Sequence, residues 1–308
     1  MAFLYKGPAQ RGAVWAEQFA RKMPQLPFWT WPEVANPDQV RFLAAWEPPA
    51  RLAETLPSLE ILFSVGAGVD QFDFSALPPE LTVVRMVEPG LTACMCEYVS
   101  WAVLSLHRDM PLYLHQQRGS QWKEQPVRPA STRRVGVMGM GTLGRAALAQ
   151  LRLLGFDCAG WNRSRRNEPG VRCYSGEAEF DEFLARTDIL VCMLPLTPET
   201  RGILNRRVFS ALPEGASLVN AARGPHLVEA DLLAALESGR LSAAILDVCE
   251  PEPPPQGHPF WAHPRIWLTP HIASATQAST AGEALLDNLR RYEAGLPLEG
   301  VVDRSRGY

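Results

Sequence analysis

Three segments of this sequence carry side chains that can bind an anionic group and exchange a proton with it. Arg223 lies in the run Asn-Ala-Ala-Arg-Gly, Glu252 in Asp-Val-Cys-Glu-Pro-Glu-Pro, and His271 in Thr-Pro-His-Ile-Ala-Ser. A guanidinium group binds carboxylates through charge-assisted hydrogen bonds, and histidine is the most frequent general acid or base. A carboxylate beside a histidine favours the imidazolium form, which can donate a proton. Together the three residues indicate acid–base chemistry on a small anion.

A glycine-rich turn provides a second functional signal. Gly139, Gly141 and Gly144 have the G-x-G-x-x-G spacing, and Thr142 and Leu143 lie between the last two glycines. The first glycine permits a tight turn, the second lets a pyrophosphate approach the backbone, and the third lets a helix pack on a strand. An apolar run precedes this turn and a helical pattern follows it. Because N–H groups at a helix N-terminus bind phosphate, the segment predicts a dinucleotide site rather than only a tight turn.

The end of the next predicted strand indicates which dinucleotide binds. Domains that bind NAD usually place an acidic residue there, where it contacts the ribose hydroxyls. This chain instead has Asn162, followed by Arg163, Ser164, Arg165 and Arg166. Guanidinium groups suit a 2′-phosphate, so the segment favours NADP(H) over NAD(H). The alternative is a basic turn that contacts only solvent.

The predicted elements place these segments along one edge of a sheet. In the second half of the chain, apolar runs alternate with helical patterns, which indicates a parallel α/β sheet. The predicted strands cover residues 156–161, 189–194, 217–219, 243–248 and 266–268. Open α/β sheets bind ligands at the carboxyl ends of their strands. We therefore expect the arginine, glutamate and histidine segments, each of which follows a strand, on one rim with the dinucleotide.

The first hundred residues show a similar alternation. Their predicted strands, which proline-rich boundaries separate, cover residues 40–46, 59–65 and 81–87. One long helix is predicted over residues 91–114, and the polar stretch 116–134 is expected to cross the surface. A last helix, over residues 275–294, is expected to return the chain to the first domain.

The composition excludes several classes of protein. The 308 residues are 46% hydrophobic and 20% charged, as in ordinary globular domains, and the net charge is −3. Proteins that bind nucleic acid or a membrane surface normally have a basic excess, so neither partner is expected. The six cysteines lack metal-ligand spacing, and most of them are expected to be free, buried thiols. The first residues lack the regions of a signal peptide, so a cytoplasmic enzyme without a metal is predicted.

With these motifs the sequence resembles the D-isomer-specific 2-hydroxy-acid dehydrogenases, and most of all their glyoxylate/hydroxypyruvate reductase branch. Two further segments match the family: Ser-Val-Gly-Ala-Gly-Val-Asp at 64–70, its substrate-loop glycine motif, and Leu-Pro-Leu-Thr at 194–197, which lies against the nicotinamide. The resemblance covers nearly the whole chain. It implies an α/β fold of two Rossmann-like domains, parallel sheets flanked by helices, with an interdomain cleft. The substrate (catalytic) domain would be discontinuous (1–99 and 281–308), and the dinucleotide-binding domain would span 100–280.

The resemblance also implies roles for single residues. His271 would be the acid/base, Glu252 its partner, and Arg223 the residue that binds the substrate carboxylate or carbonyl. Asp247 would contact the nicotinamide carboxamide. The substrate carboxylate would bind the backbone N–H groups of Val65, Gly66 and Ala67. The other implied cofactor contacts are Leu194, Pro195, Leu196, Ala221, Ala222 and Ser274.

Two departures from the family pattern affect the segment that contains Glu252. Cys249 stands where the family more often has an aromatic residue, and several prolines stiffen the loop. Glu250 is a competing carboxylate. We prefer Glu252 because it immediately precedes Pro253, as in the Glu-Pro pair of the family.

The implied activity is the NADPH-dependent reduction of a small 2-oxo acid, glyoxylate or hydroxypyruvate, with His271 as the general acid. One alternative is NAD-dependent oxidation of another D-2-hydroxy acid, and a second is a non-catalytic, dinucleotide-sensing protein on the same fold. Trp46 either walls the substrate pocket or is a core or interface residue, and the sequence leaves both interpretations open. The helix that begins near Leu91 resembles the dimer-forming element of the family, so a homodimer is expected.

Overall fold

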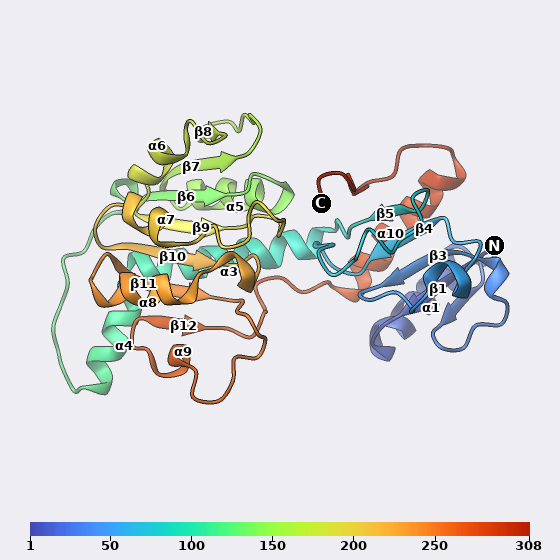
Figure 1. The fold of residues 1–308 in the computed structure, drawn as a ribbon, viewed down its shortest axis with the longest axis horizontal. Coiled ribbons are helices and arrows are strands. Elements are labelled where there is room, and N and C mark those ends of the chain that lie inside the picture. The colour runs from blue at the N-terminus through green and yellow to red at the C-terminus, as the bar shows by residue number, and fades with distance from the viewer. The chain divides into compact units, whose positions relative to one another are not determined.

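The computed structural model describes residues 1–308 and divides the chain into two compact units (Figure 1). The first unit consists of residues 1–91 and 275–308, and the second of residues 92–274. Each unit has its own parallel sheet with a buried apolar cluster on either face. Two parallel sheets flanked by helices confirm the predicted fold class. None of the helices combines the length and the apolar character that crossing a membrane requires.

The sheet of the first unit has five strands in the order β2-β1-β3-β4-β5. These are β1 (Ala2–Lys6), β2 (Phe28–Thr30), β3 (Val40–Ala45), β4 (Ile61–Ser64) and β5 (Thr82–Val84). Its helices are α1 (Ala9–Lys22), α2 (Leu52–Thr55), α10 (Ala278–Glu293) and the 3-10 turn η1 (Pro37–Gln39). Trp15 of α1 donates its indole N–H to the Ala278 carbonyl at 2.7 Å, which ties the start of α10 to this unit. The C-terminal helix thus completes the first unit.

The sheet of the second unit has seven strands in the order β12-β11-β10-β9-β6-β7-β8. These are β6 (Arg134–Met138), β7 (Asp157–Asn162), β8 (Arg172–Ser175), β9 (Ile189–Cys192), β10 (Ala216–Asn220), β11 (Leu241–Leu246) and β12 (Ile266–Leu268). Counted from β6, the first six strands have the 3-2-1-4-5-6 order of dinucleotide-binding sheets. The order reverses between β6 and β9, which is where such sheets bind their ligand.

Helices connect these strands on both faces of the sheet. They are α3 (Pro89–His107), α4 (Met110–Arg118), α5 (Thr142–Leu153), α6 (Phe180–Ala185), α7 (Arg206–Ala211), α8 (Glu229–Glu237) and α9 (Pro259–Ala262). Two 3-10 turns, η2 (Ala130–Thr132) and η3 (Gly224–His226), complete the unit. Neighbouring residues of β6 belong to opposite clusters, Val137 to one and Met138 to the other, so both faces of the sheet are covered.

The single helix predicted over residues 91–114 is wrong, because the structure has two helices there. α3 ends at His107, Asp109 takes a left-handed conformation with φ 54°, and α4 begins at Met110. Pro111 explains the break, because its ring nitrogen carries no N–H to donate to the His107 carbonyl four residues earlier. The boundaries predicted after residue 99 and before residue 281 fall inside α3 and α10.

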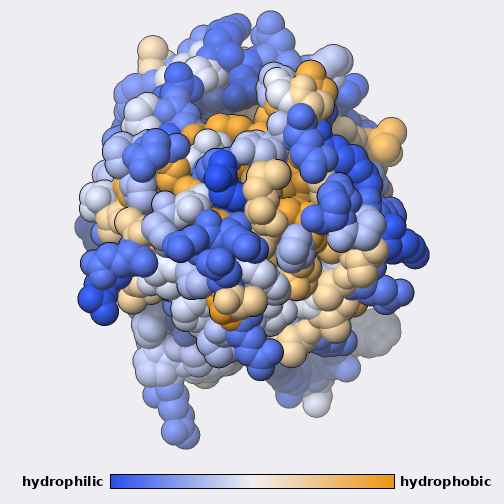
Figure 2. All heavy atoms as spheres, turned by 90° about the vertical axis from the view of Figure 1, so that its right-hand side faces the viewer, coloured by the Kyte–Doolittle hydropathy of each residue, from blue (hydrophilic) through white to orange (hydrophobic).

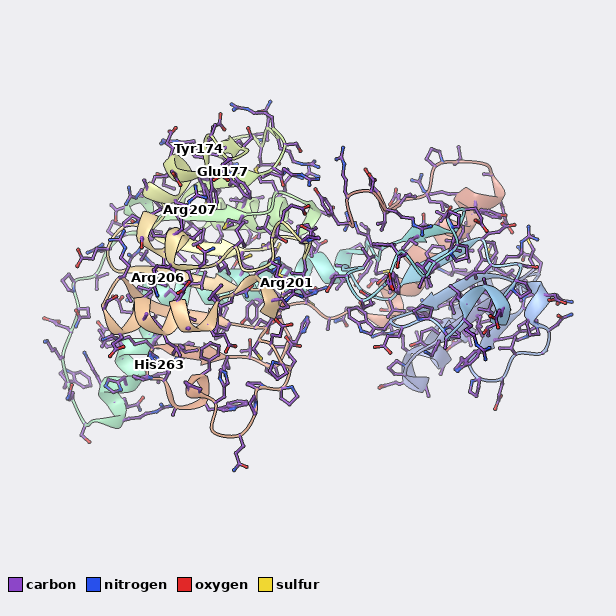
Figure 3. The ribbon with its side chains drawn as sticks, viewed as in Figure 1. Tyr174, Glu177, Arg201, Arg206, Arg207 and His263 are labelled. Carbon is purple, nitrogen blue, oxygen red and sulfur yellow. The ribbon has the colours of Figure 1, made fainter.

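Many charged residues on the surface of the second unit form ion pairs with residues of opposite charge. Arg207, labelled in Figure 3, lies between Glu177 at 2.7 Å and Asp181 at 3.2 Å. The face of the molecule shown in Figure 2 is mostly hydrophilic, with smaller apolar areas between the polar ones.

All six cysteines are free thiols, but only Cys158 and Cys192 are buried, so the expectation that most of them are buried is wrong.

Candidate active site

The glycine turn between β6 and α5 is tightly packed on one side and open on the other. Gly139 has a φ of 102°, and a Cβ atom there would lie 2.6 Å from the Met193 carbonyl oxygen. A Cβ at Gly144 would lie 1.9 Å from the Gly139 oxygen, so helix and strand meet too closely for a side chain. A Cβ at Gly141 would meet no atom within 4 Å. Gly141 is the N-cap residue of α5, so no side chain caps the helix there. The open space thus lies at the N-terminus of α5, where N–H groups can bind a phosphate.

Glu179, which the sequence did not indicate as a functional residue, organises the basic turn after β7. Asn162 ends β7 and donates its side-chain amide to the Ser164 carbonyl at 3.1 Å. Arg165 pairs with Glu179 at 2.8 Å, and the other oxygen of Glu179 accepts the N–H of Ser175 at 2.6 Å. This backbone hydrogen bond is the main cause that lowers the pKa of Glu179. A carboxylate at the start of α6 therefore holds one of the arginines proposed for a 2′-phosphate.

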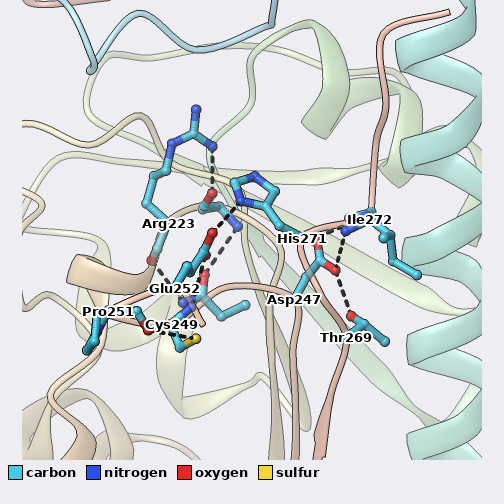
Figure 4. Close-up of polar contacts among 11 residues, drawn as sticks. Arg223, Asp247, Cys249, Pro251, Glu252, Thr269, His271 and Ile272 are labelled. Atoms are coloured by element: carbon cyan, nitrogen blue, oxygen red, sulfur yellow. Dashed lines mark hydrogen bonds and ion pairs between the residues drawn. The ribbon is translucent and has the colours of Figure 1, made fainter. Parts of the chain in front are cut away.

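The histidine and the preferred glutamate are in direct contact. His271 Nδ1 lies 2.9 Å from Glu252 Oε2, and Glu252 Oε1 accepts the N–H of Cys249 at 3.2 Å (Figure 4). Glu250 instead pairs with Arg201 at 3.4 Å. Because Nδ1 faces the carboxylate, Nε2 is the ring atom of His271 left to exchange a proton with a substrate.

Asp247 organises the turn that carries the histidine. It is 2% exposed, and its carboxylate accepts the Thr269 hydroxyl at 2.6 Å and the N–H groups of Ile272 and Ala273 at 2.8 Å each. The single hydroxyl proton of Thr269 goes to this carboxylate, so Tyr98, 2.6 Å from Thr269 Oγ1, must donate in their contact. Burial raises the pKa of Tyr98, and the charge of Asp247 adds to the effect. The tyrosine therefore remains a hydrogen-bond donor.

The loop that carries Arg223 is fixed through its backbone. Asn220, fully buried at the end of β10, donates to the Arg223 carbonyl at 3.0 Å and accepts the N–H of Ala222 at 3.2 Å. A Cβ at Gly224 would lie 2.1 Å from the carbonyl oxygen of Cys249, so this loop touches the backbone of the glutamate loop. Arg223 itself is partly exposed and donates from Nη1 to the Ala222 carbonyl at 2.8 Å.

Cys249 lies beside the glutamate, and its surroundings keep the thiol protonated. Burial, followed by the charges of Glu252 and Glu229, raises the pKa of its thiol to about 11. The thiol is therefore protonated near neutral pH, and the thiolate is the nucleophilic form of cysteine.

The predicted substrate loop belongs to the first unit, where Ser64 organises it. The Ser64 hydroxyl donates to the Gly68 carbonyl at 2.8 Å and accepts the N–H of Gly66 at 3.2 Å. The N–H of Val65 donates to the Ala45 carbonyl at 3.3 Å. Two of the three predicted donors thus have partners within the unit, and the third is the N–H of Ala67.

Trp46 directly follows β3 and lies against the same loop. A Cβ added to Gly66 would be 3.0 Å from the Trp46 ring. Trp46 is 41% exposed, so it is not a core residue.

The second unit combines a sheet with the strand order of dinucleotide-binding domains, a glycine turn at a helix N-terminus, and a His–Glu pair near an arginine. These features define a dinucleotide-dependent dehydrogenase. Residues 100–273, more than half of the chain, match the D-isomer specific 2-hydroxyacid dehydrogenase, NAD binding domain. The chain therefore belongs to the D-isomer-specific 2-hydroxyacid dehydrogenase family, which confirms the resemblance seen in its sequence.

Individual relatives cover the whole chain. A glyoxylate/hydroxypyruvate reductase A from Klebsiella pneumoniae is 36% identical over 300 residues, 96% of both chains. A D-isomer specific 2-hydroxyacid dehydrogenase from Xanthobacter autotrophicus, crystallised with NADPH, is 38% identical with a TM-score of 0.94, over 100% of this chain and 99% of that one. An NADPH-dependent glyoxylate/hydroxypyruvate reductase from Sinorhizobium meliloti in complex with NADP is 34% identical with a TM-score of 0.90, over the same shares.

Proposed function

We propose that this protein reduces small 2-oxo acids, glyoxylate and hydroxypyruvate among them, to 2-hydroxy acids with NADPH. The observation that carries the proposal is the 2.9 Å contact between His271 Nδ1 and Glu252. It leaves Nε2 to protonate a substrate, in the same unit as Arg223 and the phosphate-binding turn. The similarity to glyoxylate/hydroxypyruvate reductases supports this substrate class.

The residues of the second unit fit NADP(H). The open N-terminus of α5 would hold the diphosphate. Gly141 would give it room, and Gly139 and Gly144 allow the close packing of the turn and the helix. Arg163 and Arg165 would bind the 2′-phosphate, as charge-assisted bonds from guanidinium groups do. The remaining contacts would come from Thr142, Leu143, Asn162, Ser164, Leu194, Pro195, Leu196, Ala221, Ala222, Asp247 and Ser274.

The chemistry follows from three side chains. When bound, reduced nicotinamide supplies the hydride that adds to the carbonyl carbon of the 2-oxo acid. Arg223 stabilises the negative charge that develops on the carbonyl oxygen, an effect worth about 3–4 kcal/mol for one well-placed donor. His271 gives its Nε2 proton to that oxygen, typically worth ~10²–10⁴-fold in rate. Glu252 holds the His271 ring in place through Nδ1.

The glycine loop of the first unit would contribute a backbone donor for the substrate carboxylate. The N–H groups of Val65 and Gly66 have partners within the unit, so this donor would be the N–H of Ala67. Trp46, which is exposed beside this loop, would limit the length of the substrate. A bulky side chain at this position would favour glyoxylate and hydroxypyruvate over longer acids.

We also infer a cytoplasmic homodimer. Large apolar side chains of α3 and α4, Trp101, Leu104, Met110 and Leu112, are each 38–41% exposed. An exposed group of this size and character is typical of an interface between subunits.

A matrix of initial rates tests the proposed activity. Glyoxylate, hydroxypyruvate, pyruvate and 2-ketobutyrate would each be assayed with NADPH and with NADH. We expect the highest kcat/KM for the first two acids with NADPH. Tight NADPH binding without turnover of any acid would instead indicate a dinucleotide sensor, and a preference for NADH would contradict the cofactor assignment.

A further inference from the structure

His226 is a fully buried histidine that the proposed chemistry does not use. It lies in η3, directly after the Arg223 loop, and is 0% exposed. Its Nε2 lies 3.2 Å from the Pro195 carbonyl oxygen. Its Nδ1 lies 3.2 Å from the backbone N of Arg223 and 3.2 Å from the Arg223 carbonyl oxygen. One imidazole ring therefore joins the loop after β9 to the loop after β10.

The partners of His226 fix its tautomer. A backbone N–H can only donate, so Nδ1 is the acceptor in its contact with the N–H of Arg223. In a neutral imidazole the proton is then on Nε2, which donates to the Pro195 carbonyl. The Arg223 carbonyl has its own donor in the side-chain amide of Asn220 at 3.0 Å. Both backbone polar groups of Arg223 are thus held by buried side chains.

We propose that His226 is a positioning residue that aims Arg223 at the substrate. The inference rests on the role proposed for Arg223. The backbone of Arg223 is extended, with φ −143° and ψ 149°, and its side chain starts from a peptide unit held by His226, Asn220 and the contact of Gly224 with Cys249. Without the Nδ1 acceptor, the part-buried N–H of Arg223 loses this hydrogen bond and the peptide turns to find another.

The two ring nitrogens do not contribute equally. The Pro195 carbonyl also accepts the Thr200 hydroxyl at 2.7 Å, so its loop keeps one bond if Nε2 is removed. The hydrogen bond that Nδ1 accepts from Arg223 is therefore the contact of His226 on which the reaction depends.

Three substitutions separate these two halves. In His226→Asn, the amide oxygen can take the place of Nδ1, and in His226→Gln, the amide nitrogen can take the place of Nε2. His226→Leu removes both. We expect kcat/KM for glyoxylate to fall by about 10- to 100-fold in the Leu and Gln variants, since misplacing a binding group by ~1 Å can cost ~10²-fold. The Asn variant should stay within about threefold of wild type, and the NADPH Kd should change little in all three.

His107→Leu is the matched control, because His107 is also a buried histidine of this unit, 7% exposed, and packs against Phe156 away from the rim. It should leave kcat/KM unchanged. If His226→Leu does not fold, the Asn and Gln variants still decide. A Gln variant as active as the Asn variant, or an equal loss in His107→Leu, would overturn the proposal.

A double-mutant cycle with Arg223→Ala tests whether His226 acts through the arginine. We expect His226→Leu to cause no further loss of kcat/KM in the Arg223→Ala background. An equal loss in both backgrounds would show that His226 acts in another way and would overturn the inference alone. If Arg223→Ala has wild-type kcat/KM, the role proposed for Arg223 fails, and the inference fails with it.

Discussion

His271 has a backbone φ of 54°, a left-handed conformation that residues with a Cβ rarely adopt. Its N–H bonds to the carbonyls of Asp247 at 2.9 Å and Thr269 at 3.0 Å. The Asp247 carboxylate holds the next two N–H groups. Strained residues persist only where their surroundings fix them, and they gather at functional sites. The conformation supports the proposed role of His271 and indicates that Asp247 maintains it.

Removal of the proposed catalytic side chains should abolish most of the activity without loss of the cofactor. We expect His271→Ala and Arg223→Ala each to lower kcat/KM for 2-oxo acids by about two orders of magnitude or more, as for loss of a general acid or a charge-stabilising donor. NADPH binding, measured by fluorescence titration, should stay nearly unchanged because neither residue lies at the phosphate turn. Loss of NADPH binding in either variant would contradict this assignment.

Activity measurements distinguish the two candidate carboxylates. In Glu252→Gln the His271 ring loses the carboxylate that holds it through Nδ1 at 2.9 Å. The ring is then less well placed, so kcat/KM for reduction should fall by up to ~10²-fold. Glu250→Gln is the matched control, since Glu250 pairs with Arg201 at 3.4 Å, and its kcat/KM should stay close to wild type. A loss in the Glu250 variant alone would show that Glu250 is the partner.

Single residues show what the sequence could predict of the site and what it could not. Arg223, Glu252 and His271 each follow a strand and stand in short motifs, so they could be found without coordinates. His226 and Pro195 are 31 residues apart and meet only because β9 and β10 are neighbours. Tyr98 reaches Thr269 across 171 residues. Contacts of this kind depend on the fold, and no local pattern marks them.

At the scale of elements, the glycine turn separates folding from binding. A Cβ at Gly144 would press on the Gly139 carbonyl at 1.9 Å, whereas one at Gly141 would meet nothing within 4 Å. We expect Gly144→Ala to cost about 1–3 kcal/mol through overpacking and to lower Tm by several degrees. Gly141→Ala should leave Tm within about 2 °C but raise the NADPH Kd by roughly tenfold, equal to about 1.4 kcal/mol. Unchanged NADPH binding in Gly141→Ala would place the diphosphate elsewhere.

The turn after β7 should set the cofactor preference. Charge-assisted bonds to a 2′-phosphate contribute roughly 1.5–3 kcal/mol each, and a carboxylate there would repel the phosphate. Replacement of Asn162 by Asp together with Arg163 by Ala should narrow or reverse a preference for NADPH of about ten- to several-hundred-fold in kcat/KM. The KM for the 2-oxo acid should hardly change. Equal kcat/KM for the two coenzymes in the wild type would mean that the basic turn contacts only solvent.

Most strands with strong apolar runs could be predicted from the sequence, but β1, with Ala2, Phe3, Leu4 and Tyr5 fully buried, was not. The predicted strands include β3, β4 and β9, whose residues are almost all buried. The short edge strand β8 was not predicted, because it begins with the exposed Arg172 and its pattern is largely polar. Helix α1 was not predicted either, because its buried Trp15 and Phe19 lie between polar residues. Such elements depend more on tertiary packing than on local propensity.

At the scale of the whole molecule, the exposed apolar side chains of α3 and α4 predict an association between copies. Stable interfaces bury about 800 Å² per partner around an apolar centre, and Leu104 and Leu112, 38% and 39% exposed, belong to such a group. We expect analytical ultracentrifugation to give about twice the chain mass of 34.1 kDa at micromolar concentration.

Charge placed in this group should separate the copies. Leu104→Glu combined with Leu112→Glu should give a monomer of 34.1 kDa, because two carboxylates per chain would lose their water at the interface. Leu153→Glu is the control, since Leu153 is 82% exposed at the end of α5 and lies outside the group; it should keep the wild-type mass. Both variants should keep the wild-type far-UV spectrum, so that a lower sedimenting mass reports a loss of association and not unfolding. If the wild-type protein sediments as a monomer, the predicted association between copies is wrong and this apolar surface binds a different partner.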